Sequence, residues 1–164
     1  MGFARRTRWL DAQEQQVWAQ LSTMILRLQP VLSAQLQREF GISQFEYLIL
    51  ARLSEAPGST LRMSVLATLT GGSLPRLSQA VGRLEKRGWI SRQPDAHDSR
   101  YTVAILTPAG LRRLQEAAPS HVDAVREFVF DRLTRAQARQ LGAISQRILD
   151  GLPPDDSWPS TTPS

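Results

Sequence analysis

The chain has 164 residues, of which 41% are hydrophobic, which suits one globular domain with a sizeable core. It contains no cysteine, which excludes disulfides, thiolate metal ligands and thiol-based redox sensing. The net charge of +5 favours a polyanionic partner, nucleic acid before an anionic membrane. There is no run of about 18 apolar residues and no apolar core of a secretory signal, so we expect a cytoplasmic protein with no membrane contact.

The first part of the chain predicts a flexible basic arm over residues 1–10 and then a long helix. Over residues 11–40 apolar side chains recur at steps of three or four, and a second apolar stripe runs beside the first. We therefore expect a helix that is apolar on more than one side. Pro30 should kink it and Gly41 should end it.

Three shorter helices are predicted next. Ser43 and Glu46 have the spacing of a capping box, and apolar spacing predicts a further helix over residues 63–70. Ser73 caps the helix after that, and Pro75 is tolerated in its first turn. The buried stripe of this last helix, with one residue in each turn, is Leu77, Val81 and Leu84.

Gly88 should stop that helix, and residues 89–92 and 101–106 then predict two paired strands with a polar loop between them. Thr107-Pro108 begins another helix, with a bend at Pro119, and a capping box at Thr134 begins the last one. Residues 151–164 are rich in Pro, Ser and Thr and are expected to be disordered. The order predicts a mainly α fold with a small β-hairpin wing (α+β), a winged helix-turn-helix.

Motifs for catalysis are absent from the sequence. The two histidines, His97 and His121, have no partner pattern for a nucleophile, and no phosphate-binding or dinucleotide-binding loop is present. His97 with Asp95 and Asp98 could in principle hold a metal, but a solvated loop is the favoured interpretation. We expect no enzyme, cofactor or metal; an enzyme with an inconspicuous carboxylate pair is the alternative.

The helix that follows Ser73 offers side chains suited to DNA. Short or planar polar groups near a helix N-terminus can meet base edges in a major groove, and here they are Ser73, Arg76, Ser78 and Gln79. Arg83 lies further along and is better placed for phosphate. The alternative interpretation is an ordinary exposed polar face.

The hairpin loop carries Arg92, Asp98 and Arg100, and is too polar to be core. An arginine on a protruding wing can enter a narrow minor groove, where the negative potential is enhanced. Asp98, two residues away, is placed to fix the guanidinium of Arg100 by a planar, bidentate contact. The alternative is a surface ion pair of little worth.

The block from Leu84 to Gly110 resembles the wing signature of the MarR family of bacterial regulators. That signature joins a leucine-glutamate-x-x-glycine helix end, an arginine after the first strand, a D-x-R wing and a closing leucine-threonine-x-x-glycine. The matching positions are Leu84, Glu85, Gly88, Arg92, Asp98, Arg100, Leu106, Thr107 and Gly110. The resemblance extends from about Asp11 to Leu149, although Pro30 and Pro75 are not typical of it.

The resemblance implies a homodimer within one MarR-like domain over residues 11–150. The terminal helices (11–42 and 107–150) would form the dimerisation region around a winged-helix DNA-binding region (43–106). The chain has more apolar surface than a small winged helix can bury alone, and a dimer interface would cover the excess. The residues concerned are Leu10, Trp18, Val122, Val125, Phe128, Val129 and Ile144. A self-contained monomer core is the alternative.

The function that these expectations describe is a sequence-specific, double-stranded DNA-binding regulator that reads a pseudo-palindromic operator. Resemblance to the family implies a repressor released by a small ligand, with aromatic or phenolic compounds as candidates. The ligand cleft would lie between the dimerisation helices and the winged region. Trp18, Tyr47 or Met63 could lie near it, although plain core residues are the simpler interpretation. The alternative function is a winged-helix protein-protein interaction module without DNA binding.

Overall fold

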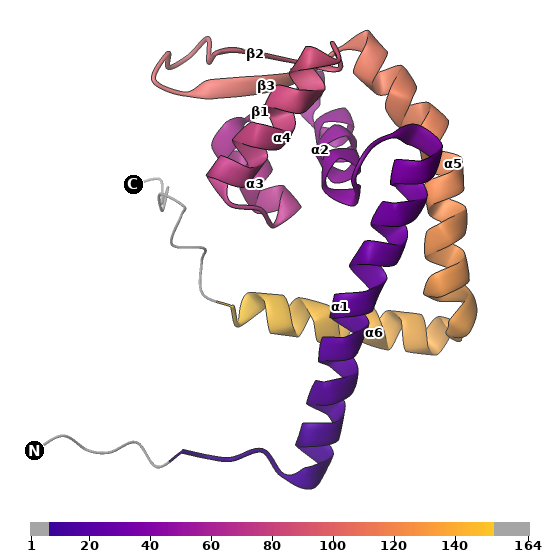
Figure 1. The fold of residues 1–164 in the computed structure, drawn as a ribbon. Coiled ribbons are helices and arrows are strands. Elements are labelled where there is room, and N and C mark those ends of the chain that lie inside the picture. Colours follow the sequence, from indigo (N-terminus) through magenta and orange to yellow (C-terminus); the bar gives the residue numbers. More distant parts are fainter. Residues whose placement is uncertain (1–6, 153–164) are drawn as a thin grey trace, which may run out of the picture.

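A computed structural model describes residues 7–152 as a winged-helix body from which the first and the last helices extend (Figure 1). The elements are α1 (Ala12–Phe40), α2 (Gln44–Glu55), the 3-10 turn η1 (Pro57–Ser59), β1 (Thr60–Arg62), α3 (Met63–Thr70), α4 (Leu74–Lys86), β2 (Ile90–Pro94), β3 (Thr102–Leu106), α5 (Pro108–Phe128), η2 (Phe130–Arg132) and α6 (Arg135–Asp150). The predicted flexible arm and disordered tail lie mostly outside the described residues, which leave out 1–6 and 153–164.

The predicted helix boundaries are confirmed because local side chains satisfy the terminal backbone groups. Ser43 Oγ accepts from the backbone N–H of Glu46 at 3.2 Å, and the Glu46 carboxylate accepts from the N–H of Ser43 at 2.9 Å. Thr134 forms the same reciprocal box at the start of α6. Gly41 ends α1 with a positive φ of 65°, which favours glycine.

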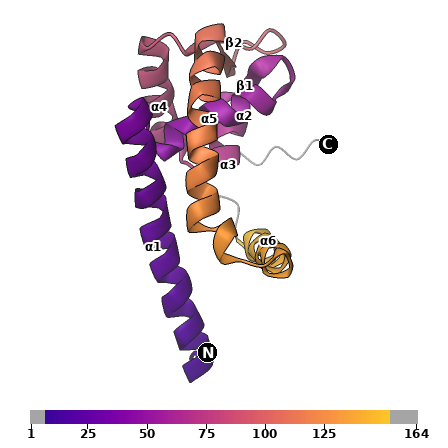
Figure 2. The same ribbon diagram turned by 90° about the vertical axis from the view of Figure 1, so that its right-hand side faces the viewer.

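Neither Pro30 nor Pro119 ends its helix, and Pro75 is accommodated at the start of α4. Pro30 lies inside α1 and Pro119 inside α5, and both helices continue past them (Figures 1 and 2). Pro75 is in the first turn of α4, where a backbone N–H has no helical acceptor and its loss is harmless.

The sheet corrects the prediction of a two-stranded hairpin, because it contains three antiparallel strands in the order β1-β3-β2. The predicted pair is present, over Ile90–Pro94 and Thr102–Leu106. The missed strand, β1, pairs Arg62 with Val103 on the other edge of β3. Three residues are too few to show an alternating pattern, and the partner strand is distant in sequence.

The core lies between α2, α3, α4 and the sheet, and the predicted stripe of α4 is fully buried there. From α1, only the last third reaches this core, through residues such as Leu36. The rest of α1 and α6 extend away from it (Figures 1 and 2). As a result, many large apolar side chains of these helices and of α5 are exposed in a single chain. They include Val17, Trp18, Met24, Ile25, Leu26, Val31, Val122, Phe128, Ile144, Ile148 and Leu149.

Gly110, in the first turn of α5, lies directly against the start of the wing. A Cβ at this position would stand 2.1 Å from the carbonyl oxygen of Trp89 and 2.8 Å from a methyl carbon of Leu106. Because the first obstacle is backbone, the change Gly110→Ala should lower the free energy of unfolding by about 3 kcal/mol. Chemical denaturation of both proteins measures this.

Gly82→Ala is the matched control for that prediction. Gly82 lies in the interior of α4, and no atom outside the helix backbone lies within 4 Å of the Cβ position. Alanine there should raise the free energy of unfolding by up to about 1 kcal/mol, because it has the higher helix propensity. Equal effects of the two substitutions would contradict the packing assigned to Gly110.

His121 on α5 is buried, with 8% of its surface exposed, and its ring centroid lies 4.2 Å from that of Tyr47 on α2. Within the described part of the chain its Nδ1 atom has no hydrogen-bond partner. Burial lowers the pKa of His121 below its usual value of 6.5, because the charged imidazolium loses its hydration. The folded state therefore binds fewer protons than the unfolded state as the pH falls.

This predicts that the free energy of unfolding is constant above about pH 7 and falls as the pH drops below the unfolded pKa of His121, by up to about 1.4 kcal/mol per pH unit for one proton. His121→Gln should flatten the dependence between about pH 7 and pH 5, before carboxylates contribute. Urea titrations at fixed protein concentration measure it, with His97→Gln as the control. An unchanged slope in His121→Gln would assign the dependence to other groups.

Candidate nucleic-acid interface

The helix α4 presents one polar face to solvent because its apolar face is buried in the core. Ser73 caps it, and its Oγ accepts from the N–H of Arg76 at 3.4 Å. Leu77 and Val81 are fully buried, so Gln79 and the arginines of the helix point outward. Ser78 is half-buried on the side of the wing. The local sequence thus produces the exposed face that the spacing predicts.

Arg76 is not free in solvent but lies over an aromatic ring of α2. Its guanidinium carbon is 4.2 Å from the centre of the Phe45 ring. A cation over an aromatic face is held electrostatically, by about 0.5–1 kcal/mol at an exposed site. Arg76 would leave this position only for a comparable or stronger partner, such as a guanine edge or a phosphate.

Arg83 is tied to α2 by a buried carboxylate. Its Nε donates to Glu46 Oε1 at 2.8 Å, while the other oxygen of that carboxylate serves the Ser43 capping box. Burial raises the pKa of Glu46, but the bonds from Ser43 and Arg83 outweigh it, so the net pKa is lowered. About half of the Arg83 side chain is exposed, which leaves its remaining N–H donors able to reach a phosphate.

Arg92 on β2 is held against α4 by Glu85. Its Nη2 and Nε donate to Glu85 Oε2 at 2.6 and 3.0 Å, and its backbone N–H donates to Oε1 at 3.1 Å. The side-chain bond from Arg92 is the main cause that lowers the pKa of Glu85. This contact explains why a glutamate at the end of α4 occurs together with an arginine in β2. It fixes the base of the wing relative to the helix.

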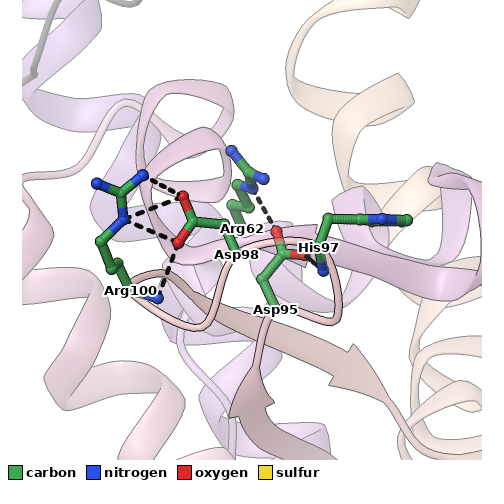
Figure 3. Close-up of polar contacts among 5 residues, drawn as sticks. All are labelled: Arg62, Asp95, His97, Asp98 and Arg100. Atoms are coloured by element: carbon green, nitrogen blue, oxygen red, sulfur yellow. Dashed lines mark hydrogen bonds and ion pairs between the residues drawn. The ribbon is translucent and has the colours of Figure 1, made fainter.

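The predicted bidentate contact at the wing tip is confirmed (Figure 3). Arg100 Nε donates to Asp98 Oδ1 at 2.9 Å, and Nη2 donates to Oδ2 at 2.6 Å. These bonds lower the pKa of Asp98 to about 2, so the carboxylate stays charged at neutral pH. The Arg100 side chain remains 82% exposed. Its guanidinium is therefore both oriented and accessible.

A second contact, which the sequence did not predict, supports the wing. Arg62 on β1 donates from Nε to Asp95 Oδ2 at 2.5 Å, and the N–H of His97 donates to the other oxygen at 2.8 Å (Figure 3). Arg62 also lies over Tyr101, with 4.5 Å between its guanidinium carbon and the ring centre. The bond from His97, followed by that from Arg62, lowers the pKa of Asp95.

These contacts also bear on the metal alternative that the sequence left open. Asp95 is engaged by Arg62 and Asp98 by Arg100, so both carboxylates are already paired with arginine. Across residues 7–152, no group of three or more His, Cys, Asp or Glu side chains is placed to hold a metal ion. The wing loop is thus organised by ion pairs with arginine.

Six of the eight predicted residues line two grooves that flank α4, and Ser73 and Asp98 line neither. A groove of about 310 Å³ between α4 and the wing is lined by Ser78, Arg92 and Arg100. A larger groove of about 770 Å³ on the other side of α4, against α1 and α2, is lined by Arg76, Gln79 and Arg83 together with residues such as Ser33 and Phe45.

The residues named as neighbours of a ligand cleft do not meet at either groove as a set. Tyr47 and Met63 are core residues, as the simpler interpretation expected, and Met63 also lines the smaller groove. Trp18 does not belong to the core, since 60% of its surface is exposed on α1.

Within the described residues, no helix combines the length and apolar character that crossing a bilayer requires.

We compared the sequence and the fold with those of known proteins. A family model described as MarR family matches residues 40–100. A MarR family transcriptional regulator from Streptomyces coelicolor, Sco3205, solved in complex with DNA, is 43% identical, with 94% of this chain and 98% of that chain covered and a TM-score of 0.89. AbsC, another MarR family regulator of that organism, is 35% identical, with 88% and 97% covered and a TM-score of 0.82.

The transcriptional repressor MprA of Escherichia coli is 27% identical over 68% of this chain, and the match spans 63% of the length of that repressor. These relatives are transcriptional regulators, which favours neither the protein-interaction module nor the enzyme considered as alternatives. With its winged helix, oriented wing arginine and near full-length match to regulators of this kind, the chain belongs to the MarR family of DNA-binding transcriptional regulators.

Proposed function

We propose that this protein controls transcription in the cytoplasm by binding a pseudo-palindromic DNA operator as a homodimer. The observation that carries the proposal is the groove between α4 and the wing, because Ser78, Arg92 and Arg100 line it together. A helix beside a protruding basic loop can occupy a major groove and the adjacent minor groove at once.

Each predicted residue has a role in this proposal. Side chains near the N-terminus of α4 meet base edges in the major groove: Ser73, Arg76, Ser78 and Gln79. Arg100, oriented by Asp98, enters the minor groove. Arg83 and Arg92 contact the phosphate backbone, since each keeps N–H donors beyond those bound to its glutamate.

The homodimer is proposed because a single chain leaves a large apolar surface uncovered. The exposed apolar side chains gather on α1, α5 and α6, and Phe128 with Met24 lines a groove of about 710 Å³ beside the N-terminal half of α1. A patch of this kind marks a protein interface. Residues 11–42 and 107–150 would then dimerise, and residues 43–106 would bind half-sites about 34–36 Å apart, one turn of DNA.

A repressor released by a small ligand is the regulatory form of the proposal. The groove of about 770 Å³ separates α1 from α4 and is lined by Arg76, Gln79 and Arg83. It lies between the dimerisation helices and the winged region, where the ligand cleft was expected. An aromatic or phenolic acid held there by the arginines would compete with the contacts of α4 to DNA.

The experiment that tests the proposal is footprinting on the DNA that flanks the gene, followed by binding measurements over a range of salt concentrations. We expect a protected, pseudo-palindromic site, with log K falling linearly in log salt at about 0.9 per phosphate neutralised. Benzoic and hydroxybenzoic acids should weaken this binding. Absence of any protected site, or an affinity independent of salt, would contradict DNA binding, and binding unaffected by the acids would contradict this ligand class.

A further inference from the structure

The guanidinium groups of two arginines lie close to the Trp89 ring, at the point where α4 meets α1 and α5. The guanidinium carbon of Arg87, directly after α4, is 5.0 Å from the centre of the Trp89 ring. The guanidinium carbon of Arg113, on α5, is 5.6 Å from the same centre. We call Arg87, Trp89 and Arg113 the tryptophan clamp.

Both arginines of the clamp bind the carboxyl end of α1. Arg87 Nη1 donates to the carbonyl oxygen of Gly41 at 2.8 Å, and Arg113 Nη2 donates to the carbonyl oxygen of Phe40. Carbonyl groups at a helix C-terminus lack helical donors and carry partial negative charge, so two cations are well placed there. Arg113 also lies over the Phe40 ring, with 5.2 Å from its guanidinium carbon to the ring centre.

The backbone of Trp89 holds the clamp to the winged-helix body. Its N–H donates to the carbonyl of Leu84 in the last turn of α4 at 3.0 Å, and its carbonyl accepts from the N–H of Thr107, the N-cap of α5, at 3.0 Å. Gly110 packs on that same carbonyl without room for a side chain. The residue whose ring both arginines approach is therefore attached through its backbone to α4 and to the start of α5.

The tryptophan clamp supplies the hydrogen bond between the end of α4 and the end of α1. Among residues 7–152, the bond from Arg87 to Gly41 is the only hydrogen bond that joins the segment 73–88 to the segment 11–41. The other interhelical bond of α4, from Arg83, goes to α2. Alongside the apolar packing of Leu36 in the core, this contact therefore helps to fix the angle between α4 and α1.

We propose that Arg87 and Arg113 are positioning residues which, through Trp89 and the end of α1, set the half-site spacing that the dimer accepts. The inference rests on the proposed function, because spacing has meaning only for a dimer that reads two half-sites. Rigid attachment raises affinity for the matching spacing and lowers tolerance of others, since the orientation is paid for before binding.

The test uses the full-length protein and a set of duplexes. Starting from the site that the wild-type protein protects, one or two base pairs are inserted or removed between the half-sites. The wild-type protein should show a sharp optimum. Arg87→Ala and Arg113→Ala should lose about fivefold to tenfold in affinity at the optimum and less at altered spacings, which flattens the profile.

Three controls separate positioning from other effects. Lys86→Ala removes the neighbouring cation and should lower affinity by the same factor at every spacing, as loss of a phosphate contact does. Arg87→Lys keeps the charge but loses the planar guanidinium beside Trp89 and its hydrogen-bonding geometry, so it should flatten the profile as Arg87→Ala does. Circular dichroism and thermal unfolding verify that each variant is folded.

The outcomes distinguish the two proposals. If the wild-type protein protects no site, the proposed function fails and the positioning role fails with it. If the wild-type protein has a sharp optimum and folded Arg87→Ala and Arg113→Ala variants keep it, with a uniform loss at all spacings, DNA binding stands and the positioning role is overturned. Recovery of the sharp optimum in Arg87→Lys would make charge alone sufficient and would also overturn the role of the Arg87 guanidinium.

Discussion

The substitution Ile144→Asp is expected to convert the protein from a dimer into a monomer and to weaken DNA binding by at least about a hundredfold. Ile144 lies on α6 with 58% of its surface exposed in a single chain, so aspartate costs the isolated fold little. In the proposed dimer the same position would be buried against apolar side chains, where an unpaired carboxylate is strongly unfavourable. A monomer binds only one half-site, so it loses the gain in affinity that comes from binding two half-sites at once.

The measurements are sedimentation equilibrium and binding to the protected duplex, with Gln146→Asp as the control. Gln146 is exposed on the opposite face of α6, where its amide donates to Asp150 Oδ1 at 2.7 Å, and aspartate there adds the same charge away from the position of Ile144. That variant should remain a dimer with nearly wild-type affinity. A dimeric Ile144→Asp protein would place the interface elsewhere, and a monomeric one with full DNA affinity would show that two heads are not needed.

Features that depend on neighbours in sequence were predictable. In the capping boxes at Ser43 and Thr134, and at the helix end formed by Gly41, the interacting residues lie within four positions of one another. Both partners of each contact can therefore be recognised in a short stretch of sequence. The same holds for Asp98 and Arg100, which are two residues apart. Here the backbone itself brings the groups together, and propensity and chemistry suffice.

Features that depend on distant partners were not predictable. Arg83 pairs with Glu46 across 37 positions, and Arg62 pairs with Asp95 across 33, through a strand too short to be recognised. The stacking of Arg76 on Phe45 likewise needs the packing of α4 on α2. Sequence therefore identified which residues face solvent, but not that most of the predicted arginines are already engaged by this chain.

The wing arginine differs from the others because its partner travels with it. Arg76, Arg83 and Arg92 are attached to α2 or α4, so replacing any of them also changes how elements pack. The only ion-pair partner of Arg100 in the described structure is Asp98 on the same loop. Replacing it should leave the stability of the fold unchanged, and a loss of affinity can then be assigned to the contact with DNA.

Arg100→Ala should therefore weaken binding to the protected site by about 1–3 kcal/mol and make the salt dependence shallower, with no change in thermal unfolding. Asp98→Asn leaves the arginine in place but removes the charged half of the bidentate contact, so it should produce a smaller loss. Because the pKa of Asp98 is about 2, the carboxylate is fully ionised near neutral pH, and the difference between wild type and Asp98→Asn should not depend on pH there. Equal affinity of Arg100→Ala and wild type at every salt concentration would remove the wing from the interface. An Asp98→Asn protein that binds more tightly than wild type would show that the carboxylate repels phosphate more than it orients Arg100.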